Sequence, residues 1–308
     1  MKSALHTFWL ALSAPVQATI LMVVAMVFFT SMLIFIRLAS DEIHTLEVVF
    51  FRNFLAFMFL LPWLMHQGFA TLKTKRFGLL ATRAAINVVG MVAGFFALTL
   101  IPLAEATALG FTAPLWATIG AVMILGEVIR MRRMVALVLG FVGVLILLRP
   151  GVESISLGSV LALTHAFLIA VTTLIVKRLT VTERPSTIVI WMALMQSLLS
   201  FVPALYVWQW PSLIAWLWLG CLAGAGTLGH LCWTRAFSIA EVSQLQPLEF
   251  IKLPLIAVFA YWVFAESPTI WTWLGGCVIF ASTAYISLRE ASLARQRARA
   301  TRATSPKQ

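Results

Sequence analysis

The chain has 308 residues, of which 61% are hydrophobic and only 11% are charged, and its mean hydropathy is +0.98. Soluble domains contain about 45–50% apolar and about 25% charged residues, so the composition excludes an ordinary soluble domain and indicates an integral membrane protein. The net charge of +11 does not indicate nucleic-acid binding, because the basic residues lie in short loops and a C-terminal tail and build no recognition module.

Ten apolar segments follow one another along the chain. A helix needs roughly 17–25 such residues to cross a bilayer, and strands in isolation could not satisfy their backbone groups in lipid, so we expect ten transmembrane helices. The predicted spans are 18–37, 46–66, 79–100, 103–125, 133–149, 156–176, 187–207, 212–233, 242–264 and 269–288.

Lys and Arg residues predict the orientation of these spans. With an internal N-terminus, 17 of the 22 Lys and Arg residues fall in inner loops and tails, whereas Arg37 and Arg149 fall outside. Arg52, Arg83 and Lys252 lie within spans. Because positive charge concentrates on the cytoplasmic side, both termini of this multi-pass protein are predicted to be cytoplasmic.

The two halves of the chain echo each other. The stretches 101–127 and 238–266 both begin with Ala-Glu near a helix start, contain proline and end on Glu. Glu105 thereby matches Glu241, and Glu127 matches Glu266. Since each copy has five spans, an odd number, the second copy is predicted to be inverted relative to the first. The expected fold class is therefore an all-α integral membrane protein with an inverted 5+5 repeat, a plan typical of secondary transporters.

This organisation resembles the EamA-type branch of the drug/metabolite transporter superfamily. The resemblance rests on the ten spans, on the Pro and Gly-Glu pattern of the fourth span, and on Phe-Phe-Arg-Asn at 50–53, and it covers about 18–290. It implies an inner-membrane carrier of amino acids, vitamins, nucleoside-like compounds, S-adenosylmethionine or drugs, with a central cavity lined by both halves.

The ninth span contains the most unusual local sequence, PLEFIKLP at 247–254. Glu249 and Lys252 are three residues apart and could pair on one helix face, offsetting part of a desolvation cost of about 2.5–3.5 kcal/mol for each charge. Pro247 and Pro254 are expected to loosen the helix around them. We interpret this stretch as the wall of a water-filled cavity, although a structural salt bridge to a neighbouring span is the alternative.

The other ionisable and polar residues within spans have two interpretations each, either substrate contact or helix packing. Arg52 could anchor a carboxylate or phosphate, or could pair with Glu47 or Glu105. The candidates for substrate binding or coupling are Arg52, Glu249, Lys252, His165, His230, Asn87 and Trp116. The candidates for gates or ion pairs are Glu105, Glu127, Glu241, Glu266 and Arg37.

Glycine pairs at GxxxG spacing occur in the third and eighth spans. They are Gly90 with Gly94, and Gly220 with Gly224, the latter followed by Gly226 and Gly229. Close packing of neighbouring helices is the expected consequence.

No phosphate-binding GxxxxGK[ST], HExxH or GxSxG motif is present, so neither ATP-driven transport nor hydrolysis is indicated. No cofactor or metal is expected. The leading hypothesis is a secondary transporter of a small amphipathic metabolite that works by alternating access. The alternatives are a membrane enzyme acting on a lipid-linked substrate and a non-transporting membrane scaffold.

The domain organisation follows from these assignments. We expect a cytoplasmic N-terminal segment (1–17), a first repeat (18–149), a second repeat (150–290) and a basic disordered cytoplasmic tail (291–308). The expected partners are the small-molecule substrate, protons and, at the tail, anionic lipids. A monomer or a homodimer is compatible with the sequence, and nucleic acid is not an expected partner.

Overall fold

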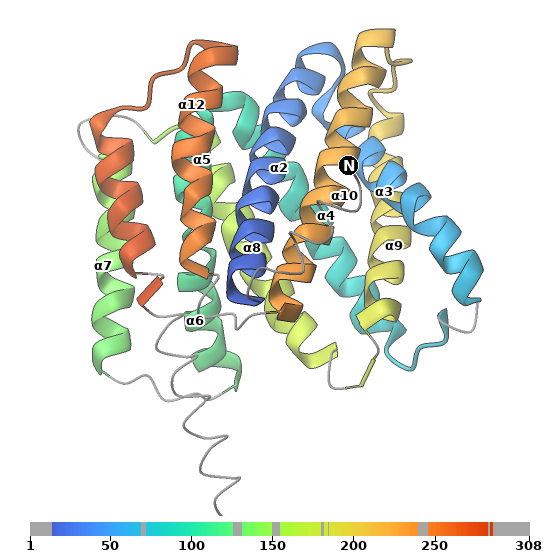
Figure 1. The fold of residues 1–308 in the computed structure, drawn as a ribbon, viewed down its shortest axis with the longest axis horizontal. Coiled ribbons are helices and arrows are strands. Elements are labelled where there is room, and N and C mark those ends of the chain that lie inside the picture. Colours follow the sequence, from blue (N-terminus) through green and yellow to red (C-terminus); the bar gives the residue numbers. More distant parts are fainter. Residues whose placement is uncertain are drawn as a thin grey trace, which may run out of the picture.

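The structure is a computed structural model that describes residues 14–68, 72–125, 131–149, 155–179, 182–183, 185–239, 246–282 and 284–285. Within these ranges all regular structure is helical, and the helices stand side by side (Figure 1). The predicted N-terminal segment up to residue 13, the basic tail, Glu127 and Glu241 lie outside the described residues.

The helical elements correspond to the ten predicted spans. They are α2 (Ala14–Glu42), α3 (Thr45–Gln67), α4 (Phe77–Leu100), α5 (Leu103–Gly110), α6 (Ala113–Leu125), α7 (Met131–Leu148), α8 (Leu157–Leu179), α9 (Pro185–Leu205), α10 (Leu213–Ile239), the 3₁₀ helix η2 (Gln246–Ile251), α12 (Lys252–Phe264) and a last helix, Ile270–Ser282. Six of them, α2, α3, α4, α8, α9 and α10, are long and apolar enough to cross a membrane. The four other predicted spans consist of shorter or interrupted helices.

The fourth and ninth predicted spans are each interrupted. In the fourth, the chain leaves α5 through a tight turn, in which Thr112 donates through its backbone N (3.0 Å) and its Oγ1 (2.7 Å) to the Leu109 carbonyl, before α6 begins. In the ninth, η2 changes to α12 at Lys252. The loosened helix predicted between Pro247 and Pro254 is therefore confirmed, as a 3₁₀ segment. Pro254 lies in the first turn of α12, where its missing N–H leaves no helical bond unmade.

Contacts between helix termini define the two ends of the bundle. At one end, here the Glu266 end, Glu266 bonds to Arg37 at the end of α2 and to Leu103 N at the start of α5. At the other, the Glu183 end, Glu183 accepts from Thr74 Oγ1 (2.8 Å) and Lys75 N (3.1 Å), which precede α4. Successive spans run alternately between these ends (Figure 1).

Helices distant in sequence form the most extensive contacts. α2 packs against α10, α4 against α8, α3 against α9, and α5 against α12. The predicted close packing at Gly90 and Gly94 is confirmed, because a Cβ at these positions would lie 3.2 Å from Leu168 Cβ and 2.6 Å from His165 Nδ1 of α8.

The equivalent prediction for Gly220 and Gly224 is wrong, because a Cβ on either residue would meet nothing within 4 Å. For Gly226 and Gly229, the other glycines of the same prediction, close packing is confirmed, because a Cβ would lie 3.1 Å from Met32 and 2.9 Å from Phe29 of α2. The reason is the helix rotation: Gly226 and Gly229 face α2, and Gly220 and Gly224 do not.

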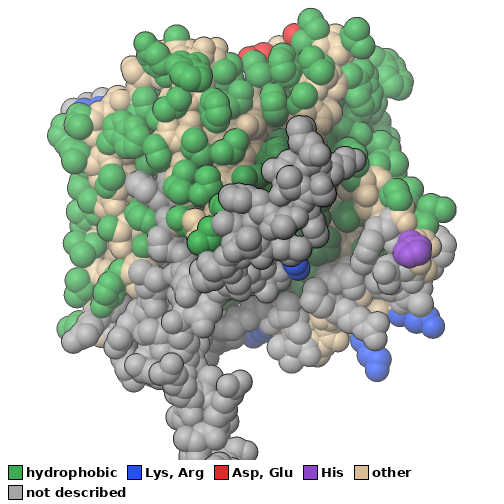
Figure 2. Space-filling view, viewed as in Figure 1, with side chains coloured by type: hydrophobic (Ala, Val, Ile, Leu, Met, Phe, Trp, Pro, Cys, Tyr) green, Lys and Arg blue, Asp and Glu red, His purple; other side chains and the backbone are tan. Residues whose placement is uncertain are grey.

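Among the described residues, the side chains on the visible face of the bundle are mostly hydrophobic (Figure 2). Acidic side chains gather at its upper end and basic side chains mostly at its lower end. A broad apolar band between charged ends is the surface that a bilayer requires of a helical bundle.

Candidate functional site

A cavity of about 940 Å³ lies within the bundle. Its walls come from α2, α3, α4, α5, α6, α8, α9, α10, η2 and α12, so both halves of the chain contribute. The polar side chains that line it include Arg52, Asn87, His165, Gln196, His230, Trp233, Glu249 and Lys252. Six of the seven residues predicted as substrate-binding or coupling candidates therefore meet around one cavity.

The two charges of the ninth span have separate neighbours. Glu249 accepts a hydrogen bond from the indole Nε1 of Trp233 at 3.2 Å. Lys252 Nζ lies 5.7 Å from the centroid of the Phe29 ring, within the range of a cation–π contact. The expected pairing of Glu249 with Lys252 is not found, since the ion pair seen among the described residues joins Arg37 to Glu266. Both charges instead line the cavity.

Arg52 belongs to a chain of hydrogen bonds that links α3 to α9. Its Nη1 donates to Asn53 Oδ1 (3.1 Å), and Asn53 Nδ2 donates to Ser200 Oγ (3.3 Å). Ser200 Oγ in turn donates to the Gln196 carbonyl at 2.6 Å. The suggested partners Glu47 and Glu105 bind elsewhere: Glu47 accepts from Gln209 N, and Glu105 from Ser159 Oγ at 3.0 Å. These bonds join the two helices at the cavity wall and hold the Arg52 guanidinium there.

The two histidines occupy different surroundings. His165 Nδ1 lies 2.7 Å from the Gly90 carbonyl. Because a carbonyl can only accept, Nδ1 must carry the proton of this bond, which holds the ring against α4. His230 packs edge-on against Phe29, with ring centroids 5.0 Å apart.

Asn87 and Trp116 differ in their relation to the cavity. Asn87 lines it. Trp116 is not among the lining residues, and its ring contacts Phe141 and Phe167 edge-on, with centroids 5.1 and 5.6 Å away. Stacking of Trp116 on a substrate therefore stays a prediction without a contact to support it.

Three of the gate candidates gather at the Glu266 end. One oxygen of Glu266 binds Arg37, and the other accepts from Leu103 N at 3.0 Å, which satisfies a backbone donor at the start of α5. The Arg37 guanidinium also lies 4.8 Å from the Phe264 ring centroid. Glu105, in the first turn of α5, binds the start of α8 through Ser159. We call Arg37, Glu266 and Leu103 the Glu266 clamp, because it joins α2, α12 and α5.

Gln196 is a cavity residue that is absent from the predicted candidates. It is 1% exposed, and its Nε2 has no hydrogen-bond partner among the described residues. The available sequence signal was a single amide within an apolar span, and such an amide serves equally often to join helices. Only the packing shows that it lines the cavity with its donor unused.

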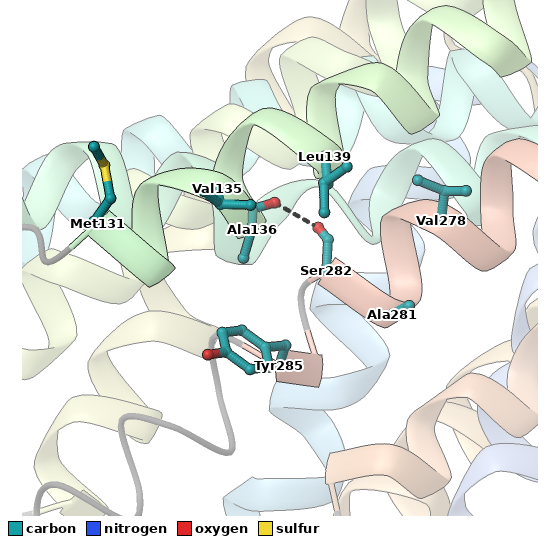
Figure 3. A pocket seen from close by; sticks show the side chains of 8 residues that line it. All are labelled: Met131, Val135, Ala136, Leu139, Val278, Ala281, Ser282 and Tyr285. Carbon is teal, nitrogen blue, oxygen red and sulfur yellow. Dashed lines mark hydrogen bonds between the residues drawn. The ribbon is translucent and has the colours of Figure 1, made fainter.

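A second hollow, of about 640 Å³, lies between α7 and the last helix (Figure 3). Met131, Val135, Leu139 and Val278 contribute to its apolar lining, and the hydroxyl of Ser282 is already bonded to the Ala136 carbonyl at 2.8 Å. This lining offers little to orient a polar metabolite, so the central cavity is the candidate site.

A cavity lined partly by polar and ionisable side chains, inside a bundle with six helices able to cross a membrane, is the candidate small-molecule site of a multi-pass membrane protein. The chain belongs to the EamA-like transporter family, whose family model matches it twice, over residues 17–149 and 156–288. This match and the transporters to which the chain is similar place it in the drug/metabolite transporter superfamily, and they indicate a transporter, not an enzyme.

Two relatives illustrate the similarity. The chain is 34% identical over 248 residues to a riboflavin transporter of Vibrio cholerae, covering 79% of this chain and 82% of the relative. It is 30% identical over 251 residues to an S-adenosylmethionine uptake transporter of Rickettsia bellii, covering 82% and 86%. A solved crystal structure shares the fold with a TM-score of 0.62 at 16% identity, covering 89% of this chain and 97% of the other.

Proposed function

We propose that the protein is a secondary transporter that moves a small amphipathic metabolite through the central cavity by alternating access. The observation that carries the proposal is the cavity itself, because Arg52, Asn87, His165, His230, Glu249 and Lys252 all line it. Ionisable groups within membrane spans are costly and mark substrate or ion pathways. Riboflavin and S-adenosylmethionine are the first substrates to test, since they are the compounds named for the relatives.

The proposal includes an inverted repeat of five spans, with 18–149 and 150–290 as its copies. It is supported by the contact pattern, in which α2 packs on α10 and α4 on α8. In this repeat the first span (α2) corresponds to the sixth (α8), and the third span (α4) corresponds to the eighth (α10). The contact of α2 with α10 is therefore the counterpart of the contact of α8 with α4. The second span (α3) corresponds likewise to the seventh (α9), so the contact of α4 with α9 is the counterpart of the contact of α10 with α3. Two such halves around a shared site could rock to expose it alternately on each side.

The Glu266 clamp is proposed as the lock of one gate. It connects the ends of α2 and α12 with the start of α5, and these elements come from both proposed copies. The Arg37 side chain is 20% exposed and the Glu266 side chain is 18% exposed. Opening this end would therefore have to break a largely shielded ion pair. The positive-inside bias assigns the Glu266 end to the outside and both termini to the cytoplasm of the inner membrane.

The experiment is transport into vesicles reconstituted with the purified protein. Labelled riboflavin and S-adenosylmethionine are each offered, with and without a pH gradient, which reports whether protons couple to transport. We expect saturable uptake of at least one compound, and a sharp decrease in Arg52→Ala and Glu249→Gln. Uptake equal to that of protein-free vesicles for every compound, in protein that is folded, would contradict the proposed substrates. Wild-type uptake in both variants would remove these two residues from the mechanism.

A further inference from the structure

On one side of the cavity, the adjacent helices α3 and α9 each contribute a lining side chain that carries hydrogen-bond donors, Arg52 and Gln196. Arg52 is held by Asn53, and Asn53 is bonded to Ser200, which lies one turn after Gln196 and donates to its carbonyl. Gln196 is 1% exposed and lines the cavity, and its Nε2 donor has no partner among the described residues. A buried donor without a partner costs about 1–3 kcal/mol, so a purely structural role would leave its cost unexplained.

The charges around the cavity are unbalanced. Arg52 and Lys252 supply two positive charges, whereas Glu249 is the carboxylate among the described lining residues. That carboxylate already accepts from Trp233 at 3.2 Å. A cationic ligand would therefore meet a net positive lining in a site of low dielectric, where such repulsion is strong.

On the basis of the proposed transport function, we propose that Arg52 and Gln196 form a subsite for hydrogen-bond acceptors. It binds carbonyl or carboxylate oxygens of a substrate that carries no net positive charge. The planar guanidinium supplies a fork of donors, and the amide of Gln196 supplies another donor from the adjacent helix α9. Neutral and anionic compounds are admitted, and sulfonium or ammonium compounds are rejected.

The test measures equilibrium binding to the purified, full-length protein by thermal shift and by quenching of tryptophan fluorescence. The probes are riboflavin, which is neutral and has ring carbonyls, flavin mononucleotide, which adds a phosphate, and S-adenosylmethionine, which is a sulfonium. We expect one of the flavins to bind at least about tenfold more tightly than S-adenosylmethionine, equivalent to about 1.4 kcal/mol. The neutral and the phosphorylated flavin distinguish a carbonyl ligand from an anionic one.

Three variants locate the subsite. Gln196→Met removes the donor at similar volume, and Gln196→Glu replaces it with an acceptor. Both are expected to weaken flavin binding by about tenfold, and Gln196→Met is expected to retain or increase the melting temperature, because the side-chain donor has no partner to lose. Arg52→Lys keeps the charge but loses the planar fork and should weaken binding similarly. Gln209→Met, the same substitution at an exposed glutamine outside the cavity lining, should bind as the wild type does.

The outcomes separate this inference from transport itself. Tighter binding of S-adenosylmethionine than of both flavins, or wild-type flavin binding by Gln196→Met, would overturn the acceptor subsite while leaving a transporter. A lower melting temperature for Gln196→Met with unchanged affinity would also overturn it, because it would assign the residue to packing. Failure of the proposed function would appear differently, as binding without any uptake into vesicles.

Discussion

The fourth and ninth spans are interrupted at the same place but carry different chemistry. α6 begins at Ala113 and α12 at Lys252, and each lies 14 residues before the Glu that closes its span, Glu127 or Glu266. Around the first interruption the cavity is lined by Gly110, Phe111 and Ala113. Around the second it is lined by Glu249 and Lys252.

The two interruptions share a backbone geometry but differ in the side chains that they offer to a ligand. Both interruptions bring a helix end to the cavity wall, and α5 packs against α12 there. Charges at only one of them make the cavity asymmetric, because the ninth span contributes charged groups to the lining and the fourth span does not. Fold-level duplication thus does not require two equivalent binding surfaces.

The largest effect is expected from making the ninth span resemble the fourth. Lys252→Ala introduces the residue found at the matching position and removes a charge from the cavity. We expect uptake into vesicles to fall by at least about tenfold, equivalent to about 1.4 kcal/mol, since charges within spans are retained for function. Ala113→Ser, a small change at the matching position of the fourth span, should preserve uptake. Equal uptake by Lys252→Ala and wild type would show that the chemical difference between the interruptions is not used.

The closing glutamates provide the second comparison. Glu266→Gln removes the charge from the Glu266 clamp, and hydrogen bonds to charged groups contribute about 1.5–3 kcal/mol, so thermal unfolding in detergent should shift downwards accordingly. Arg37→Ala combined with Glu266→Gln should destabilise by less than the sum of the two single effects.

Glu42→Gln provides the matched control for the clamp, because Glu42 is exposed at the same end and accepts a single bond from Ser212 at 3.1 Å. Its effect should remain below about 0.5 kcal/mol. Additive effects of Arg37 and Glu266 would rule out the clamp as a unit.

The next effect, a smaller one on stability, is expected from adding a methyl group to a closely packed glycine of α4, compared with an unpacked glycine of α10. Gly94→Ala would place a Cβ 2.6 Å from His165 Nδ1, and overpacking of this kind costs about 1–3 kcal/mol. Gly224→Ala meets nothing within 4 Å and should leave stability unchanged or increase it by up to about 1 kcal/mol. The comparison is made by thermal unfolding of both variants, and equal losses would show that the contact with His165 is not tightly packed.

No effect on transport is expected from deleting residues 291–308, which lie beyond both matched regions. The predicted role of this basic tail is contact with anionic lipid, so the truncated protein should bind less to vesicles of anionic lipid while uptake is retained. A truncated protein that inserts normally but does not transport would assign the tail a part in the mechanism.

The sequence predicted the helical segments closely but not their neighbours. The predicted third span, 79–100, lies within α4, and the predicted fourth, 103–125, begins and ends where α5 begins and α6 ends. The interruption of the fourth span was not predicted, since Pro114 alone did not indicate a turn at Phe111. The pairing of Glu249 with Lys252 was wrong because each side chain found a closer neighbour on another helix, Trp233 or Phe29.

What the sequence determined by itself is the membrane class, the positions of the helical segments, and the charges that they contain. These depend on the length and polarity of continuous segments, which the bilayer selects locally. Only the tertiary structure decided that Gln196 joins Arg52 at the cavity, that Arg37 binds Glu266, and that Gly226 and Gly229 are the tightly packed glycines of α10. These contacts depend on how each helix is rotated and which helix lies beside it, and packing between distant segments sets both.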